Sequence, residues 1–192
     1  MEPSPQDLDP AGAASSPRQN VVLIGFMGAG KSTIGERVAK GLGFTFVDTD
    51  SLIEKREGKS IPKIFADSGE SGFRERESAA LESLASLEHI VLATGGGIVT
   101  VPSNAALLRE LGFVVWLNSG EDAIFRRVSK NQNRPLLRTP RPRETIRDLL
   151  REREPLYRAC ADLEIDTTDL TEDEIAFGIC ESARVRWANT NS

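Results

Sequence analysis

The chain has 192 residues, of which 39% are hydrophobic and 28% are charged, and its formal net charge is −5. This length favours one domain with a sizeable core, and no apolar run approaches the ~20 residues that a membrane span needs. The negative charge argues against nucleic acid as a partner. Two cysteines, Cys160 and Cys180, provide neither a disulfide framework nor a metal site, so we expect reduced thiols in a cytoplasmic protein.

Residues 1–19 differ from the rest of the chain. They contain four prolines, several acidic residues and serines, and little apolar material apart from Leu8. Such a segment cannot bury enough surface to offset the entropy that ordering costs. It lacks the basic region followed by an apolar region that marks a secretory signal, and its early acidic residues argue against an organelle transit peptide. We therefore expect a disordered tail over residues 1–19 and one domain over residues 20–192.

The domain begins with an apolar segment, a glycine-rich loop and a helix. Residues 21–24 are typical of a buried strand, and GFMGAGKST over residues 25–33 matches the P-loop pattern G-x-x-x-x-G-K-[ST]. Ile34, Val38 and Leu42 then recur at helical spacing. The alternative is a chance match in a glycine-rich turn. Because strand, loop and helix agree, we predict a nucleoside triphosphate site.

The residue types in this loop suit the binding of phosphate. Its glycines let several backbone N–H groups face one centre, and the positive end of the following helix also favours an anion there. Lys31 adds a positive charge for the β- and γ-phosphates, and the hydroxyl of Ser32 can bind magnesium.

Strand and helix patterns alternate along the rest of the chain. Further strands are predicted over residues 44–47, 90–93, 113–117 and 163–165. Helices are predicted over residues 52–59, 60–67, 103–111, 121–130, 143–157 and 171–187, and one more begins at about residue 71. In the helix from about 71, the residues that face the core are Phe73, Ala80, Leu81, Leu84 and Leu87. Ser103 is the expected cap of the helix over 103–111. Residues 131–142 form a basic loop with three prolines. Five strands separated by helices predict a three-layer α/β fold with a parallel sheet.

Ligands of open parallel sheets gather at the carboxyl ends of the strands, so the residues that follow each strand are candidates. Asp48 and Asp50 leave the second strand two residues apart, which places their side chains on one side of it. One can hold magnesium through water, and the other can accept a hydrogen bond from a substrate hydroxyl. The alternative is a turn that caps the next helix, but the nearby P-loop favours function. His89 precedes its strand, so we do not expect it to be catalytic.

Arg74 and Glu77 lie one helical turn apart. On the surface such a pair would stabilise the helix by only ~0.2–0.5 kcal/mol. In a pocket, the carboxylate of Glu77 could instead hold the guanidinium of Arg74 toward an anionic ligand. The residues alone leave both interpretations open.

Gly95, Gly96 and Gly97 follow the strand at 90–93. One glycine would serve a tight turn, whereas three in a row favour a backbone that approaches a ligand and offers N–H groups to it.

Arg153 falls on the apolar stripe of its helix, which Ile146, Leu149, Leu150 and Tyr157 form. An inward arginine needs a partner, because an unpaired buried charge is very costly. That partner is either a structural carboxylate or an anionic ligand, and we favour the ligand.

Six separated motifs together resemble bacterial shikimate kinases, over roughly residues 20–188. They are GFMGAGKST, DTD at Asp48 to Asp50, FRERE at Phe73 to Glu77, GGG at Gly95 to Gly97, RPLL at Arg134 to Leu137 and REPLY at Arg153 to Tyr157. The resemblance implies a P-loop kinase fold with a mobile lid at about 131–142. It also implies that MgATP phosphorylates the 3-hydroxyl of shikimate, a step of aromatic amino-acid biosynthesis.

The resemblance also implies roles for particular residues. The catalytic residues would be Lys31, Asp50 as the candidate base, and Arg134 as the lid arginine. The nucleotide would be held by Gly28, Ala29, Gly30, Lys31, Ser32, Thr33, Arg127 stacked on adenine, and Arg134. Magnesium would be served by Ser32 and, through water, Asp48. Shikimate would be held by Asp50, Phe65, Phe73, Arg74, Glu77, Gly95, Gly96, Gly97 and Arg153. We expect a monomer that has no nucleic-acid or membrane partner.

One departure from the family concerns the adenine loop. The family often has a proline there, but residues 166–172 contain none, which leaves nucleotide selectivity open. The alternatives are a kinase of the same fold for a sugar acid such as gluconate, and a nucleotide-binding module that performs no transfer.

Overall fold

The structure is a computed structural model that describes residues 18–128 and 139–190. The expected tail lies outside these residues except for positions 18 and 19, and the expected lid lies outside them except for positions 139–142. Arg134 therefore also lies outside the described residues.

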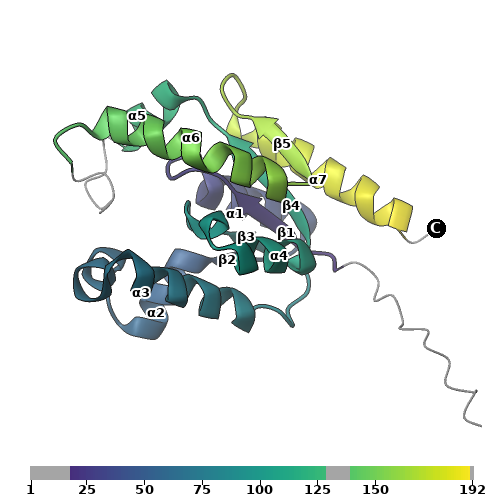
Figure 1. Ribbon diagram of the computed structural model, residues 1–192. Helices are drawn as coiled ribbons and strands as arrows, with labels where there is room; N and C mark the ends of the chain where they lie inside the picture. The colour runs from purple at the N-terminus through teal and green to yellow at the C-terminus, as the bar shows by residue number, and fades with distance from the viewer. Residues whose placement is uncertain (1–17, 129–138, 191–192) are drawn as a thin grey trace, which may run out of the picture.

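A five-stranded parallel sheet forms the centre of the described fold (Figure 1). Its strand order is β2-β3-β1-β4-β5, so the strand before the P-loop is central. The strands are β1 (Val21–Ile24), β2 (Thr45–Asp48), β3 (Ile90–Ala93), β4 (Phe113–Asn118) and β5 (Leu163–Asp166). The sheet that the alternating pattern predicted is thereby confirmed.

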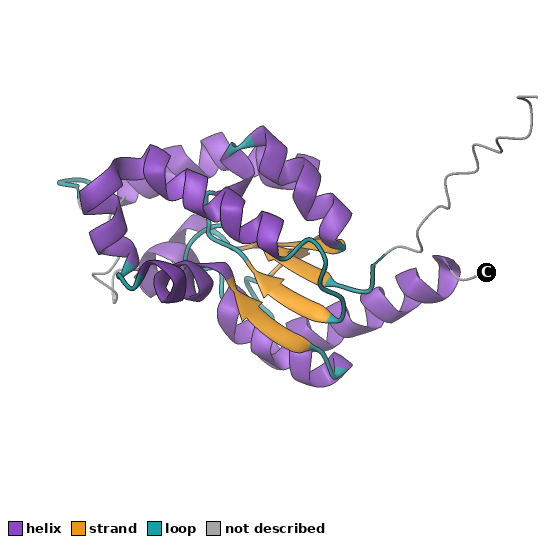
Figure 2. Cartoon of the chain, turned by 90° about the horizontal axis from the view of Figure 1, so that it is seen from below, coloured by secondary structure: helices purple, strands orange, loops and turns teal. Residues whose placement is uncertain are grey.

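Helices cover both faces of the sheet, which gives the predicted three layers (Figure 2). The helices are α1 (Lys31–Leu42), α2 (Thr49–Glu57), α3 (Ile61–Ser83), the short 3₁₀-helix η1 (Ile98–Thr100), α4 (Pro102–Leu111), α5 (Glu121–Val128), α6 (Pro142–Cys160) and α7 (Glu172–Thr190). α1 and α7 pack on one face, whereas η1, α4, α6 and the end of α3 pack on the other. In the described residues, no helix combines the length and hydrophobicity that a membrane span requires.

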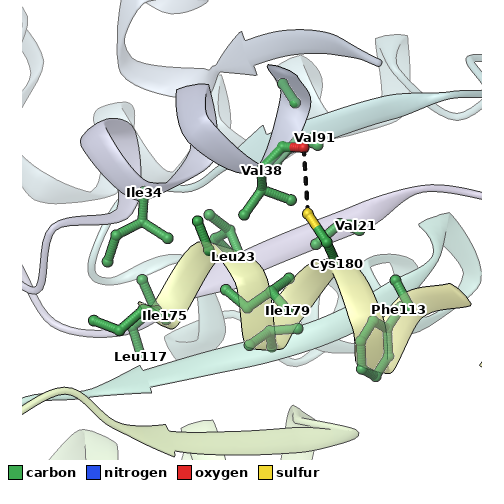
Figure 3. Close-up of a cluster of buried hydrophobic side chains, with 14 of the residues drawn as sticks. Val21, Leu23, Ile34, Val38, Val91, Phe113, Leu117, Ile175, Ile179 and Cys180 are labelled. Carbon is green, nitrogen blue, oxygen red and sulfur yellow. Dashed lines mark hydrogen bonds between the residues drawn. The ribbon is translucent and has the colours of Figure 1, made fainter. Parts of the chain in front are cut away.

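Alternation along the central strand builds these two faces. Val21 and Leu23 join the cluster under α1 and α7, while Val22 and Ile24 join the opposite cluster, and all four are fully buried. Figure 3 shows the first cluster, in which Cys180 of α7 lies against α1. Burying each large side chain contributes about 1.5–3 kcal/mol, so the two clusters hold the strand ends, and the loops that follow them, in fixed positions.

α3 spans Ile61–Ser83 but is kinked at Gly69, whose backbone is non-helical (φ 67°, ψ −171°), so two helical segments meet at the junction that the sequence predicted. The structure corrects the sequence prediction in two places. Leu87 is 40% exposed instead of facing the core, because the helix ends before it. α4 begins at Pro102 rather than after a Ser103 cap, since proline suits the first helical position.

Candidate active site

The P-loop lies between β1 and α1, at the carboxyl edge of the sheet. Gly28 and Gly30 have φ values of 82° and 93°, in the left-handed region that glycine adopts without strain. The loop leads directly into α1, which begins at Lys31. Only 8% of Lys31 is exposed, and its Nζ donates to the carbonyl oxygens of Gly25 and Phe26 at 2.8 and 2.9 Å. The N-terminus of α1 and this ammonium group thus lie together at an anion-binding position.

Asp48 fulfils both of the interpretations that the sequence offered. It is the N-cap of α2, where its Oδ1 accepts from the N–H of Ser51 at 3.1 Å. Its Oδ2 accepts a hydrogen bond of 2.7 Å from the hydroxyl of Ser32. Our geometric argument for Asp50 was wrong, because α2 already begins at Thr49 and Asp50 lies in its first turn. Asp48 and Asp50 nevertheless line the same cavity.

The oxygen donors of Ser32 and Asp48 fit a magnesium ion. Mg²⁺ in kinases is bound by one or two protein oxygens, with water and substrate phosphates completing its coordination. No cluster of three or more histidine, cysteine or acidic residues that could hold a metal occurs in the part of the chain that the structure describes.

A cavity of about 430 Å³ opens in front of the P-loop. Its volume is within the usual range of small-molecule sites. Its wall includes all the described residues that were predicted to hold the nucleotide, namely Gly28, Ala29, Gly30, Lys31, Ser32, Thr33 and Arg127. Arg127 donates to the carbonyl of Gly28 at 3.2 Å, and Leu170, which is 45% exposed, lines the same cavity from the loop before α7. Sequence reasoning had not assigned Leu170 to the site.

A second, smaller cavity lies beside the first, and Met27, Asp50 and Gly96 line both. The structure places all nine residues that were predicted to hold the substrate on its wall: Asp50, Phe65, Phe73, Arg74, Glu77, Gly95, Gly96, Gly97 and Arg153. Phe65 and Phe73 form an apolar side with ring centroids 4.7 Å apart. Sequence reasoning missed Met27, which no charge or glycine pattern distinguishes from other loop residues.

Arg74 and Glu77 form a buried ion pair rather than an exposed one. Nη1 of Arg74 lies 2.5 Å from Oε2 of Glu77, and Nη2 lies 2.7 Å from Oε1 of Glu70. Glu77 is completely buried, and burial raises its pKa to about 7, although Arg74 acts in the opposite direction. The carboxylate of Glu77 therefore holds the Arg74 guanidinium at the cavity wall.

Arg153 is directed inward, as its place on the apolar stripe predicted, and only 2% of it is exposed. Its Nη1 donates to the carbonyl of Gly96 at 3.3 Å, and its guanidinium lies 5.8 Å from the ring centroid of Phe26. Within residues 18–128 and 139–190, Arg153 forms no ion pair, and the buried Nε atoms of Arg74 and Arg153 have no hydrogen-bond partner. Two guanidinium groups at one small cavity thus retain donors for an anion.

The three glycines each allow another part of the site to approach. A Cβ at Gly95 would lie 2.1 Å from Oε1 of Glu77, and one at Gly97 would lie 2.2 Å from Nη2 of Arg74. The N–H of Gly95 donates to the hydroxyl of Thr49 at 3.0 Å, so it is not offered to a ligand as we had expected. Thr49 was also missed by sequence reasoning, since its partner lies 46 residues away.

His89 precedes β3, away from both cavities, and its ring contacts Phe44 at a centroid distance of 5.1 Å. His89 therefore lies apart from the predicted site, as its place before the strand predicted.

The chain combines a parallel sheet and a P-loop with a second cavity that shares three residues with the first. This combination defines a P-loop kinase of small molecules. The family model described as shikimate kinase matches residues 27–184. The shikimate kinase of Thioalkalivibrio sulfidiphilus is 53% identical over 148 residues, which cover 77% of this chain and 78% of the relative. The chain therefore belongs to the shikimate kinase family, and it is an ATP-dependent kinase.

Two solved structures place this assignment in the context of the fold. The shikimate kinase of Acinetobacter baumannii in complex with shikimate is 40% identical and superposes with a TM-score of 0.85, over 90% of this chain and 95% of that one. A gluconokinase of Sinorhizobium meliloti reaches a TM-score of 0.57 at 19% identity, over 91% of this chain and 95% of its own. The second likeness shows the fold alone.

Proposed function

We propose that this protein transfers the γ-phosphoryl group of ATP to the 3-hydroxyl of shikimate, giving shikimate 3-phosphate and ADP. The observation that carries the proposal is the pair of half-buried Arg74 and buried Arg153, whose Nε donors lack partners in the described residues beside the P-loop cavity. A small carboxylate would satisfy these donors with charge-assisted hydrogen bonds. The relative that was solved with shikimate supports the choice of substrate.

On the nucleotide side, the backbone of the P-loop and Lys31 would hold the β- and γ-phosphates. Ser32 and Asp48 would hold magnesium, which supplies positive charge to the phosphate oxygens when it is bound. Arg127 and Leu170 line the same cavity, and the adenine would lie between this guanidinium plane and this apolar side chain. Arg134 would add charge from the lid.

On the substrate side, Arg74 and Arg153 would bind the carboxylate of shikimate, while Phe65 and Phe73 contact its ring. Asp50 lines both cavities, and its carboxylate would accept a hydrogen bond from the hydroxyl that attacks the phosphoryl group. It is therefore our candidate for the base.

The chemistry asks for little covalent work from these side chains. Phosphoryl transfer is accelerated mainly by alignment of the attacking oxygen and by positive charge around the transferred group. The two cavities share Met27, Asp50 and Gly96, so they would hold the two reactants next to each other. A lid that excludes water would limit hydrolysis of ATP.

We propose that residues 20–192 form the kinase domain, and that the protein acts as a monomer in the cytoplasm without nucleic acid or membrane partners. Its formal charge of −5 and two free buried cysteines support this environment. Size-exclusion chromatography with light scattering checks the monomer, since a dimer would elute at twice the mass.

A coupled assay of ADP release, with ATP and Mg²⁺, tests the function. We expect release to depend on shikimate and to be absent with gluconate, and the product to carry its phosphate on the 3-hydroxyl by ³¹P and ¹H NMR. Lys31→Ala should abolish release. Release with gluconate would favour the sugar-acid kinase, and tight ATP binding with no release on either acceptor would favour the non-catalytic module.

A further inference from the structure

The carbonyl oxygen of Gly96 accepts hydrogen bonds from two side chains of α6. The hydroxyl of Tyr157 donates to it, and Nη1 of Arg153 donates to it at 3.3 Å. Gly96 lines both cavities, and a Cβ on it would lie 2.8 Å from the backbone nitrogen of Met27 in the P-loop. The glycine turn, the P-loop and α6 therefore meet at this residue.

Tyr157 is held firmly in place. It is 1% exposed, and its ring stacks on Trp116 of β4 with centroids 5.8 Å apart and planes at 27°. Burial raises the pKa of its hydroxyl, which therefore keeps its proton and remains a donor throughout the working pH range. Tyr157 follows Arg153 by four residues, so the two side chains leave the same face of α6.

The hydroxyl of Tyr157 joins two segments, α6 and the glycine turn, whose own backbone constraints are reduced. Pro155 lies inside α6 between Arg153 and Tyr157, and because proline has no N–H, the helix lacks one of its own hydrogen bonds there. The glycine turn, residues 95–97, lacks side chains that would restrict its backbone, so its backbone has more conformational freedom than a turn of other residues. On its other side, the turn is held through the bond from the N–H of Gly95 to Thr49.

We propose that Tyr157 is a positioning residue for the substrate: its hydroxyl fixes the Gly96 carbonyl, and through that carbonyl the guanidinium of Arg153 and the wall between the two cavities. This inference rests on the proposed function. When the hydroxyl of Tyr157 is absent, the Gly96 carbonyl retains only the hydrogen bond from Arg153. The guanidinium of Arg153 is then no longer fixed in the position from which it can bind a carboxylate. Substrate binding should suffer, while the nucleotide contacts of the P-loop remain.

Tyr157→Phe tests the inference because it removes the hydroxyl and keeps the ring on Trp116. We expect KM for shikimate to rise about fivefold, or ~1 kcal/mol, and KM for ATP to stay within about twofold. Cys160→Ala is the matched control. Cys160 is buried on α6, one turn after Tyr157, and lines neither cavity. Its Sγ donates a hydrogen bond to the carbonyl of Ala105 at 3.6 Å. Cys160→Ala should lower Tm without changing either KM.

A double-mutant cycle with Arg153→Lys separates positioning from general packing. If Tyr157 acts through Arg153, removing its hydroxyl from the Arg153→Lys enzyme should raise KM for shikimate by less than twofold. Equal effects of Tyr157→Phe in both backgrounds, equal rises in the two KM values, or no rise at all would each overturn the inference. Wild-type protein that releases no ADP with shikimate would overturn the proposed function and this inference together, whereas an active wild type with an unaffected Tyr157→Phe variant would overturn the inference alone.

Discussion

The hydroxyl of Ser32 donates a hydrogen bond to Oδ2 of Asp48 at 2.7 Å, and this bond joins the first turn of α1 to the end of β2. The contact brings together a hydroxyl and a carboxylate oxygen, the two groups that we propose hold the metal. Because Asp48 also caps α2, its two roles can be separated by the choice of substitution.

Asp48→Asn should keep the cap and weaken the metal site, since asparagine caps helices as well as aspartate does but carries no charge. We expect kcat/KM to fall about tenfold or more at low Mg²⁺ and to recover partly at high Mg²⁺, with Tm nearly unchanged. A Mg²⁺ titration of initial rates measures this. A loss that no concentration of Mg²⁺ relieves would contradict the role of Asp48 at the metal.

Arg153→Lys should weaken shikimate binding selectively, because lysine keeps the charge but cannot present the planar fork of donors. Hydrogen bonds to charged groups contribute about 1.5–3 kcal/mol, so we expect Kd for shikimate to rise about 10- to 100-fold. Calorimetric titrations with shikimate and with a nucleotide analogue compare the two sites. Arg151→Lys, an exposed position on the same helix, is the control and should bind both as the wild type does. Equal weakening of the two ligands by Arg153→Lys would argue for a structural role.

Gly97→Ala should displace Arg74 without straining the backbone. Gly97 has φ −111°, which alanine adopts freely, but its Cβ would lie 2.2 Å from the guanidinium of Arg74. The long side chain can move aside, so we expect a small change in Tm and about a tenfold rise in KM for shikimate. Gly178→Ala, a helical position where a Cβ meets nothing within 4 Å, should raise stability by up to ~1 kcal/mol and leave KM unchanged. Wild-type kinetics for Gly97→Ala would mean that Arg74 does not contact the substrate.

Arg134→Ala tests the proposed lid role of a residue that lies outside the described part of the chain. A donor that acts mainly on the charge of the transition state is worth about 10²–10³ in kcat, so turnover should fall by at least about 100-fold. Kd for shikimate by calorimetry should change little. Arg151→Ala, at an exposed position on α6 outside the lid and both cavities, is the control and should retain turnover. Comparable losses in turnover and in shikimate affinity would contradict a lid role.

The parts of the fold that the sequence predicted are those with local causes. β1 and the P-loop follow from a β-branched run and from glycines that must adopt positive φ, as Gly28 and Gly30 do. The inward position of Arg153 follows from helical spacing alone. Leu87 was misplaced because the apolar spacing continued past the point at which α3 ends.

The parts that could not be predicted depend on contacts between distant residues. Whether Arg74 and Glu77 are exposed depends on the burial of α3, which no local pattern encodes. Tyr157 meets Gly96 across 61 residues, and Thr49 meets Gly95 across 46. Such bonds become visible only when the strand order brings the loop after β3 between β2 and α6.

The stability of the protein should depend on pH through Glu77, whose folded pKa of about 7 lies above its ordinary value of 4.5 because the carboxyl is buried. Between these two values the native state retains a proton that the unfolded chain has released, so stability falls as pH rises through the window and levels off above pH 7. The change is on the order of 3 kcal/mol. Arg74, Asp50 and Arg153, which interact electrostatically with Glu77, are retained in the test variant.

Glu77→Gln removes this titration while keeping the size of the side chain, so its stability should be flatter than that of the wild type. Urea unfolding at four pH values from 5 to 8 measures the two slopes. Glu121→Gln is the control: interactions with Arg147 and Arg143 lower the pKa of Glu121, so this group is ionised in both states above pH 5, and its replacement should leave the slope unchanged. Parallel curves for wild type and Glu77→Gln would show that the buried carboxyl is ionised throughout, held so by Arg74, and the pH dependence would then have to arise elsewhere.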